Sequence, residues 1–222
     1  MLALIYDVHG NLPALEAVIA DARAAGADRW LLGGDYAAFG GWPRETVERL
    51  QQLEDAVWIR GNTERWLADD SDVPADAPQR PALVATRAAL GDKHVAWLAR
   101  LRERLTFAEG LFCHASPLND MESFGVEEQP GEDRLLDGIR TGRVVFGHTH
   151  VQFTRSRGEG IELVNPGSVG MPLDGDHRAA YALIAHSGVE LRRVAYDHEA
   201  AAQRAGEVAG AMFAERIRAA RP

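Results

Sequence analysis

The sequence of 222 residues contains a single cysteine, Cys113. No disulfide can form within the chain, and such low cysteine use is typical of a reducing compartment. The sequence also lacks an apolar run long enough to span a bilayer. Its N-terminal run Leu2–Tyr6 is too short for a signal peptide and has no basic segment before it. We therefore expect a cytoplasmic protein that has no membrane partner.

Basic residues are scarce relative to acidic ones, 24 against 33, which gives a formal net charge of -9. This balance argues against a broad electrostatic grip on nucleic acid or on an anionic membrane. An anionic substrate is still compatible with it, because bound divalent cations would reverse the local field. The composition, 46% hydrophobic and 26% charged, is ordinary for a globular protein. No repeat, linker or low-complexity tract divides the sequence, so a single domain over residues 1–222 is predicted.

Strand, loop and helix alternate in the first part of the sequence. Apolar runs predict strands at residues 2–6, 29–32 and 56–60, and helical spacing of apolar residues predicts helices at 12–25 and 43–53. This alternation is typical of a largely parallel sheet covered by helices.

The remainder of the sequence is dominated by short predicted strands. An exposed loop at 68–81 and a helix at 87–102 come first. Strands follow at 105–108, 111–114, 144–147, 151–156, 161–165, 180–184 and 189–194. Short connections at 157–160 and 186–188 predict hairpins and an antiparallel second half. The tail, 199–220, is predicted to be one amphipathic helix.

Side chains that bind metals recur where the predicted strands end. Five segments carry them: Asp7-Val-His9, Gly34-Asp35, Gly61-Asn62, His114 and Gly147-His148-Thr149-His150. The carboxyl ends of strands in open α/β sheets converge on one crevice. Alternate residues of a strand face the same side, so Asp7 is expected beside His9, and His148 beside His150. Taken alone each piece has an ordinary alternative: Asn62 after Gly61 reads as a turn residue, and the paired histidines as surface.

The chemistry of this ligand set favours a pair of metal ions. Histidine, carboxylate and one amide oxygen without thiolate favour Mn, Fe, Zn or Co over a structural zinc site. Seven ligands are too many for one ion but suit two ions roughly 3.5–4 Å apart. Asp35 is the expected bridging carboxylate, and Asn62 would supply a neutral oxygen.

The ordered series Asp7-Val-His9, Gly34-Asp35-Tyr36, Gly61-Asn62-Thr63-Glu64, His114 and Gly147-His148-Thr149-His150 resembles the signature of the calcineurin-like metallophosphoesterases. The small bacterial stand-alone members also resemble this chain in the turn Asn165-Pro-Gly-Ser-Val169. The resemblance implies an α/β fold of the metallo-dependent phosphatase type, a four-layer α/β/β/α sandwich of two mixed sheets. It implies two ligand sets: Asp7, His9, Asp35 and His150 around one ion, and Asp35, Asn62, His114 and His148 around the other. Mn²⁺ is the first candidate metal, with Fe, Zn, Ni and Co as alternatives.

One position departs from the family pattern. The family usually has a histidine where this chain has Thr63, and that histidine is given the task of contacting phosphoryl oxygens or protonating the leaving group. Threonine cannot act as an acid near neutral pH, which favours a phosphodiesterase over an efficient monoesterase. The resulting hypothesis is in-line attack on a small phosphate ester by a hydroxide that bridges the metals, with Asp35, Asn62 and His148 as catalytic residues.

Alternative functions and contacts stay open at this point. A phosphomonoesterase or a nucleotide or dinucleoside polyphosphate hydrolase is one alternative. A non-catalytic scaffold, like the metallophosphoesterase-fold subunit of the retromer coat, is another, although such scaffolds lose metal ligands. Thr63, His177 and Arg178 are candidate substrate contacts, with a plain surface loop as the alternative for the last two. Cys113 is predicted to be a buried core residue, and no oligomeric state is predicted.

Overall fold

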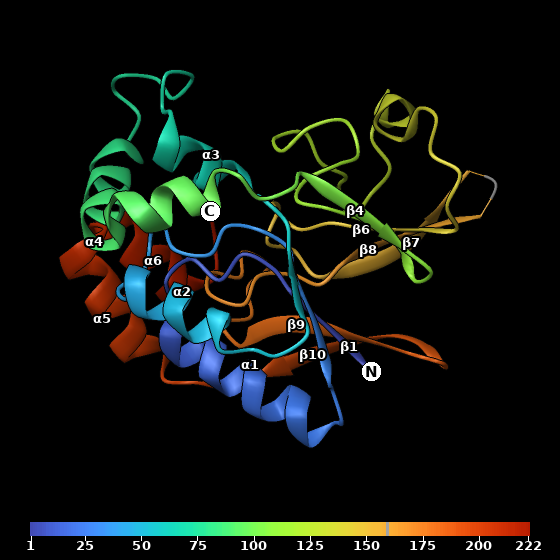
Figure 1. The fold of residues 1–222 in the computed structure, drawn as a ribbon, viewed down its shortest axis with the longest axis horizontal. Coiled ribbons are helices and arrows are strands. Elements are labelled where there is room, and N and C mark those ends of the chain that lie inside the picture. The colour runs from blue at the N-terminus through green and yellow to red at the C-terminus, as the bar shows by residue number, and fades with distance from the viewer. Residues whose placement is uncertain (159) are drawn as a thin grey trace.

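The computed structural model describes residues 1–158 and 160–222, which form two mixed five-stranded sheets (Figure 1). The first sheet has the strand order β10-β9-β1-β2-β3. Its strands are β1 (Leu2–Ile5), β2 (Arg29–Leu32), β3 (Ala56–Trp58), β9 (Ala179–Ala185) and β10 (Gly188–Val194). β1, β2 and β3 run parallel, whereas β9 is antiparallel to both β1 and β10. The expected parallel core of the first sheet is confirmed.

The second sheet has the strand order β4-β5-β6-β8-β7. Its strands are β4 (Arg104–Phe107), β5 (Gly110–Cys113), β6 (Arg143–Val145), β7 (Phe153–Arg157) and β8 (Ile161–Asn165). The prediction of an antiparallel second half is wrong for its centre, because β5, β6 and β8 are parallel. It holds for the outer pairs β4–β5 and β7–β8 and for β9–β10. The predicted connection at 157–160 includes position 159, which lies outside the described residues.

The two sheets face each other across an apolar interior. Alternation along β1 sends Leu2 and Leu4 into this interior, while Ala3 and Ile5 face the helices on the other side. Phe112 of β5 and Val145 of β6 contribute from the opposite sheet. Burial of these side chains between two sheets is what fixes the sheets face to face.

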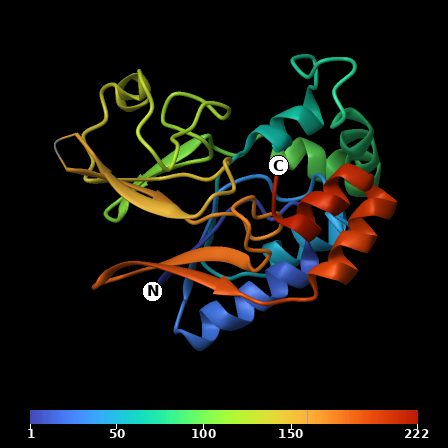
Figure 2. The same ribbon diagram turned by 180° about the vertical axis from the view of Figure 1, so that it is seen from behind.

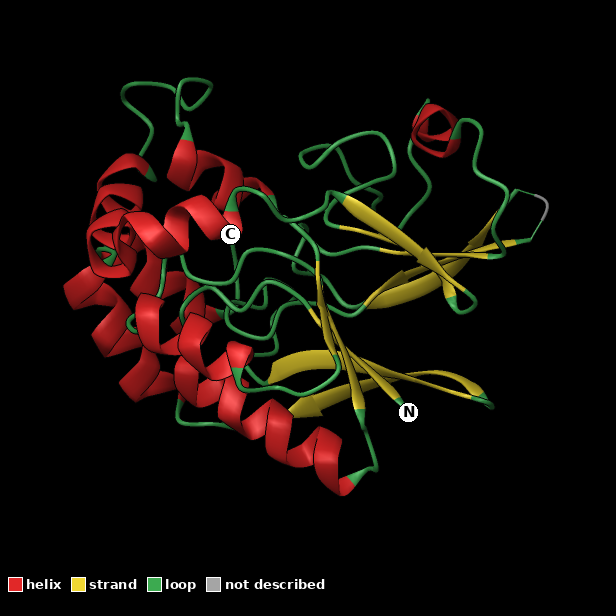
Figure 3. Cartoon of the chain, viewed as in Figure 1, coloured by secondary structure: helices red, strands yellow, loops and turns green. Residues whose placement is uncertain are grey.

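Helices cover the outer face of the first sheet and gather at one end of the molecule (Figures 1 and 3). They are α1 (Leu12–Ala24), α2 (Pro43–Gln51), α3 (Asn62–Ala68), α4 (Arg80–Leu98), α5 (His198–Val208) and α6 (Ala211–Ala219). Over the second sheet the described chain places only a 3₁₀ helix, Glu132–Leu136, and loops. The expected pair of mixed sheets with flanking helices is therefore confirmed. The layer that covers the second sheet consists of this 3₁₀ helix and the loops.

Three helix predictions need correction. Residues Asn62–Ala68 form α3 where a turn was expected, because the side chain of Glu64 caps its first turn. α4 begins at Arg80 rather than 87, because Pro81 occupies the first turn, where its missing N–H costs nothing. The predicted C-terminal helix is two helices, since Gly210, with φ of 108°, ends the helical path between α5 and α6 (Figure 2).

α4 is not continuous, because the backbone of Gly91, with φ of 72° and ψ of 163°, leaves the helical conformation and divides it into two shorter helical segments. No helix in the described ranges is both long and apolar enough to cross a membrane.

Candidate metal centre

The predicted ligands follow the carboxyl ends of five strands, β1, β2 and β3 of one sheet and β5 and β6 of the other, and all lie in loops except Asn62, the first residue of α3. These loops meet in the middle of the molecule, between the two sheets and the helical end (Figure 1). The structure brings all seven predicted ligands together: Asp7, His9, Asp35, Asn62, His114, His148 and His150. All of them except His148 are buried.

The backbone, and not strand alternation, aims these side chains. Five of the ligands have positive φ: Asp7 at 53°, His9 at 48°, Asp35 at 58°, His148 at 68° and His150 at 60°. The explanation by period-two alternation is therefore wrong, although both pairs do face the site. A left-handed backbone at a residue other than glycine costs about 1–3 kcal/mol, and it persists only where surrounding structure enforces it. The neighbouring loops therefore hold five ligand residues in a conformation that is unfavourable in itself.

One ligand group comprises Asp7, His9 and His150, whose ligand atoms lie within 4.8 Å of one another. The Nε2 atoms of His9 and His150 are 3.0 Å apart, and His150 Nε2 is 3.6 Å from Asp7 Oδ1. Each imidazole donates its Nδ1–H to a backbone carbonyl, His9 to Ala38 at 3.0 Å and His150 to Met171 at 2.7 Å. These outer bonds fix the tautomer, so that both Nε2 atoms present lone pairs inward.

The other group comprises Asp7, His114 and Asp35, whose ligand atoms also lie within 4.8 Å of one another, so Asp7 belongs to both groups. Asp35 likewise lies near both. Its Oδ1 is 3.5 Å from Nε2 of His114, while its Oδ2 is 3.8 Å from Nε2 of His9 in the first group. The carboxylate thus reaches toward both groups, as a bridging ligand would. The side-chain oxygen of Asn62 lies 2.9 Å from His114 Nε2 and 3.0 Å from His148 Nδ1. His114 donates its Nδ1–H to the carbonyl of Gly33 at 2.9 Å, which again leaves a lone pair directed inward.

These contacts fit divalent cations. Two imidazole lone pairs that face each other at 3.0 Å repel, and Asp7 Oδ1 is buried with no hydrogen-bond partner among the described residues. A buried polar atom without a partner is unfavourable unless something satisfies it. Histidine nitrogens and carboxylate oxygens are the ligands that Mn²⁺, Fe, Zn²⁺ and related ions accept.

Burial sets the protonation of the ligands. It lowers the pKa of His9 and of His148 to about 3, so these imidazoles are neutral at pH 7. Burial raises the pKa of Asp35 to about 7. The pKa of Asp7 is also raised well above its usual range, by burial and then by the negative charge of Asp35. The site therefore offers neutral imidazoles and carboxyls whose ionisation a cation would favour.

Glu64 supports the site in a way that sequence inspection missed. Its buried carboxylate accepts the N–H groups of Asp35 at 2.8 Å, Tyr36 at 2.9 Å and Gly61 at 2.9 Å. It thereby ties the loop after β2 to the start of α3. The signal was present as a glutamate three residues after Gly61, the spacing of a capping box. Its other two partners, Asp35 and Tyr36, lie 29 and 28 residues earlier in the chain, so the sequence around Glu64 does not indicate these contacts.

The turn at 165–169 supports the two histidines near β6. Asn165 donates its Nδ2–H to the carbonyl of Gly147 at 3.1 Å and to Thr149 Oγ1 at 2.9 Å. Ser168 donates its hydroxyl to the carbonyl of Asp7 at 2.7 Å. This turn therefore joins the loops that carry Asp7, His148 and His150.

The three candidate substrate contacts differ in their distance from the ligands. Thr63 is fully buried behind Asp35 and donates its hydroxyl to Asp35 Oδ1 at 2.9 Å. His177 is exposed and stacks on His198 with a ring separation of 3.8 Å, and Arg178 pairs with Asp176 at 2.6 Å. The contacts of these two residues link them to α5 and to their own loop rather than to the ligands. Cys113 is buried, as predicted, and the structure places it on the outer side of the second sheet.

Comparison with known proteins places the chain in a family. A family model for the calcineurin-like phosphoesterase superfamily domain matches residues 1–188. The chain belongs to this superfamily. It is a metal-dependent phosphoester hydrolase, of a family that uses two metal ions.

Relatives cover most of this phosphoesterase. Phosphodiesterase YfcE of Escherichia coli K12 is 28% identical over 195 residues, 83% of this chain and 88% of YfcE. Protein MJ0912 of Methanocaldococcus jannaschii is 27% identical over 218 residues, 89% of this chain and 88% of MJ0912. The crystal structure of a metallophosphoesterase from Sphaerobacter thermophilus superposes with a TM-score of 0.83 at 26% identity, covering 99% of this chain and 98% of that one.

Proposed function

We propose that this phosphoesterase is a cytoplasmic phosphodiesterase that cleaves a small phosphodiester with two divalent ions, Mn²⁺ first among them. The position of Thr63 carries the proposal. Its N–H and its hydroxyl both donate to Asp35 Oδ1, at 3.0 Å and 2.9 Å, and it has no exposed surface. Where the family usually has histidine, this chain therefore has a side chain that orients a ligand and gives no proton to a leaving group.

The ligand geometry supports two ions. Asp7, His9 and His150 would hold one, and Asn62, His114 and His148 the other, with Asp35 between them. When bound, the ions supply Lewis acidity toward the phosphoryl oxygens and lower the pKa of water from ~15.7 toward ~7. The protein's own part is orientation: Thr63 holds Asp35, and the Nδ1–H bonds hold the imidazoles.

The proposed preference for a diester follows from the absence of an acidic proton donor at position 63. Without a proton donor at position 63, cleavage should depend steeply on how readily the alcohol leaves as an anion. The net charge of -9 favours a small ester over nucleic acid. Similarity to YfcE, which is named a phosphodiesterase, supports the same choice over a monoesterase or a polyphosphate hydrolase.

A substrate comparison tests the proposal. Bis(p-nitrophenyl) phosphate and p-nitrophenyl phosphate share a leaving group, so their kcat/KM ratio in Mn²⁺, Ni²⁺, Zn²⁺ and Mg²⁺ reports preference for diester over monoester. We expect the diester to be favoured by at least roughly tenfold, equivalent to about 1.4 kcal/mol. A ratio that favours the monoester would contradict the proposal. A protein that binds fewer than two ions per chain and turns over neither compound would indicate a scaffold.

His148→Ala supplies the matched site variant. It removes a ligand that is in contact with Asn62 at 3.0 Å. We expect loss of diester turnover by roughly 10²-fold or more, since metal ligands and their orientation are worth several kcal/mol. His186→Ala, at an exposed histidine of the β9–β10 connection, should leave turnover unchanged.

A further inference from the structure

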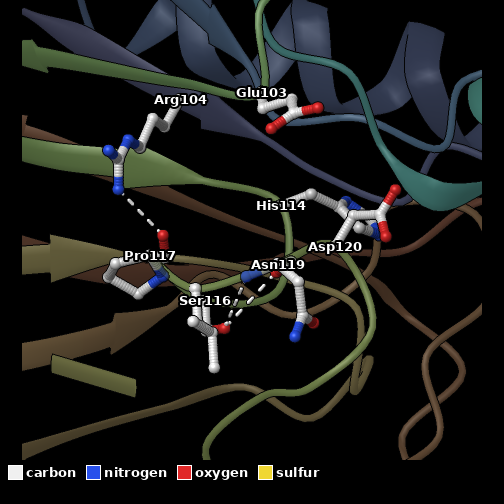
Figure 4. A pocket seen from close by; sticks show the side chains of 8 residues that line it. Glu103, Arg104, His114, Ser116, Pro117, Asn119 and Asp120 are labelled. Carbon is white, nitrogen blue, oxygen red and sulfur yellow. Dashed lines mark hydrogen bonds between the residues drawn. The ribbon is translucent and has the colours of Figure 1, made fainter. Parts of the chain in front are cut away.

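A cavity opens directly beside the candidate metal centre. It has a volume of about 180 Å³ and is reached by His114, one of the proposed ligands. One wall is the segment Ser116–Asp120, which follows His114, and the other is Glu103 and Arg104 at the start of β4 (Figure 4). Whatever occupies this cavity therefore lies next to a metal ligand.

The segment that forms this wall is held firmly. Arg65 of α3 donates two hydrogen bonds to the carboxylate of Asp120, at 2.7 Å and 3.0 Å. The side chain of Asn119 accepts the N–H groups of Met121 at 2.9 Å and Glu122 at 2.7 Å. Arg104 donates to the carbonyl of Pro117 at 2.9 Å from the opposite wall (Figure 4). The wall is thus a built surface whose shape does not need a ligand to form.

This fixed segment and its continuation hold apolar side chains out to solvent. Leu118, Met121 and Val126 are 53%, 41% and 48% exposed. Of these three, Leu118 lines the cavity, beside Pro117, while the other residues of the lining are polar or charged. Exposed apolar surface on a rigid wall beside a reactive centre favours contact with an apolar group, because its burial is worth about 25 cal/mol per Å².

We propose that this cavity receives one uncharged organic ring of the phosphodiester and that Leu118 determines the preference for a ring. The inference rests on the proposed phosphodiesterase function. A cavity of about 150 Å³ holds a benzene molecule, so about 180 Å³ suits a single six-membered ring. The two carboxylates at this cavity are already paired, Glu103 with Arg60 at 2.5 Å and Asp120 with Arg65 at 2.7 Å, so they do not compete with a ring for the apolar wall.

Binding of two phosphonates to the Mn²⁺-loaded protein tests the inference. Phenylphosphonate and methylphosphonate share the phosphorus headgroup and differ in the group offered to the cavity. We expect wild-type protein to bind phenylphosphonate roughly tenfold more tightly by calorimetry. Leu118→Asp should reduce this preference to about twofold or less and leave metal content unchanged, with Leu118→Ala intermediate, because the repulsion from the added charge acts on both phosphonates and cancels in their ratio. Val84→Asp, a matched change at a 58% exposed valine of α4, should keep the preference.

The outcomes separate the two proposals. Diester turnover without a phenyl preference, or a preference that survives Leu118→Asp, would overturn the ring pocket and leave the phosphodiesterase proposal standing. Absence of both diester turnover and phosphonate binding in the wild-type protein would overturn the two together.

Discussion

Two buried regions of this molecule meet within one strand and its exit loop. Leu4 and Asp7 lie three positions apart, and neither has exposed surface. Leu4 faces an interior of apolar side chains between the sheets, whereas Asp7 faces histidines, carboxylates and a strained backbone. Burial alone therefore does not separate the core from the site. The difference lies in what each region does to stability: burial favours folding between the sheets and opposes it among the ligands.

The largest effect should follow from neutralising the bridging carboxylate. Asp35→Asn keeps the shape of the side chain but removes the charge shared by both ligand groups. We expect diester turnover to fall by roughly 10³-fold or more, since the ions would lose several kcal/mol of binding and activation. Turnover in Mn²⁺ measures this, with Asp92→Asn, an exposed aspartate of α4, as control. Retention of activity in Asp35→Asn would refute the two-metal account.

The same variant should separate activity from stability. Burial raises the pKa of Asp35 to about 7 in the metal-free fold, so at pH 8 an ionised carboxylate is buried there. This folded pKa lies above the usual value of 3.8, so the carboxyl lowers stability progressively as pH rises from about 3.8 to about 7, and the loss is complete above that. Metal-free Asp35→Asn should melt at or above the wild-type temperature at pH 8, with a smaller gain at pH 6. A lower melting temperature at pH 8 would show that the carboxylate stabilises the fold even without metal.

The apolar region should respond in the opposite way. Leu4→Ala leaves a cavity between the sheets at a fully buried position. We expect a loss of about 2–5 kcal/mol in the free energy of unfolding. Turnover per folded molecule should stay close to wild type, because Leu4 packs in the apolar interior between the sheets and is not one of the seven ligands. Urea unfolding gives the first quantity, and turnover normalised to folded fraction gives the second. A loss of activity without a loss of stability would contradict the proposal that the apolar interior determines stability and the ligand region determines activity.

Metal binding should make the ligand region contribute to stability. Ions that bind only the folded chain add about 2.7 kcal/mol per site at a hundredfold excess over Kd. Thermal melts of chelator-treated protein should therefore rise with added Mn²⁺ and reach saturation, and Leu4→Ala should show the same increment. His148→Ala should show a smaller one. If Mn²⁺ raised the melting temperature of His148→Ala as much as that of the wild type, the stabilising cation would bind somewhere other than this site.

The sequence predicts these two regions unequally. Apolar runs such as Leu2–Tyr6 and Ile161–Asn165 locate strands to within a residue or two, because a buried strand leaves a local pattern. The ligand residues were also found, from their types and order at the strand ends. Their left-handed backbone was not, because φ at Asp7 or His148 depends on neighbouring loops. The roles of Glu64, as a clamp on Asp35, and of the segment after His114, as a cavity wall, arise from tertiary contacts alone.

The smallest effect expected is a dependence of metal affinity on pH. Asp35, with a pKa raised to about 7, must lose its proton to act as a ligand, while His9 and His148, with pKa values lowered to about 3, are already neutral. Affinity for Mn²⁺ should hence fall as pH drops below about 7, by roughly tenfold per unit for each proton released. Calorimetry in buffers of different ionisation enthalpy counts these protons. Release of about one proton or more at pH 6.5 and fewer at pH 8 would assign the dependence to the carboxyls. Constant release over this range would mean that the buried carboxylates are ionised before metal arrives, so that the ligand region carries its full charge even when empty.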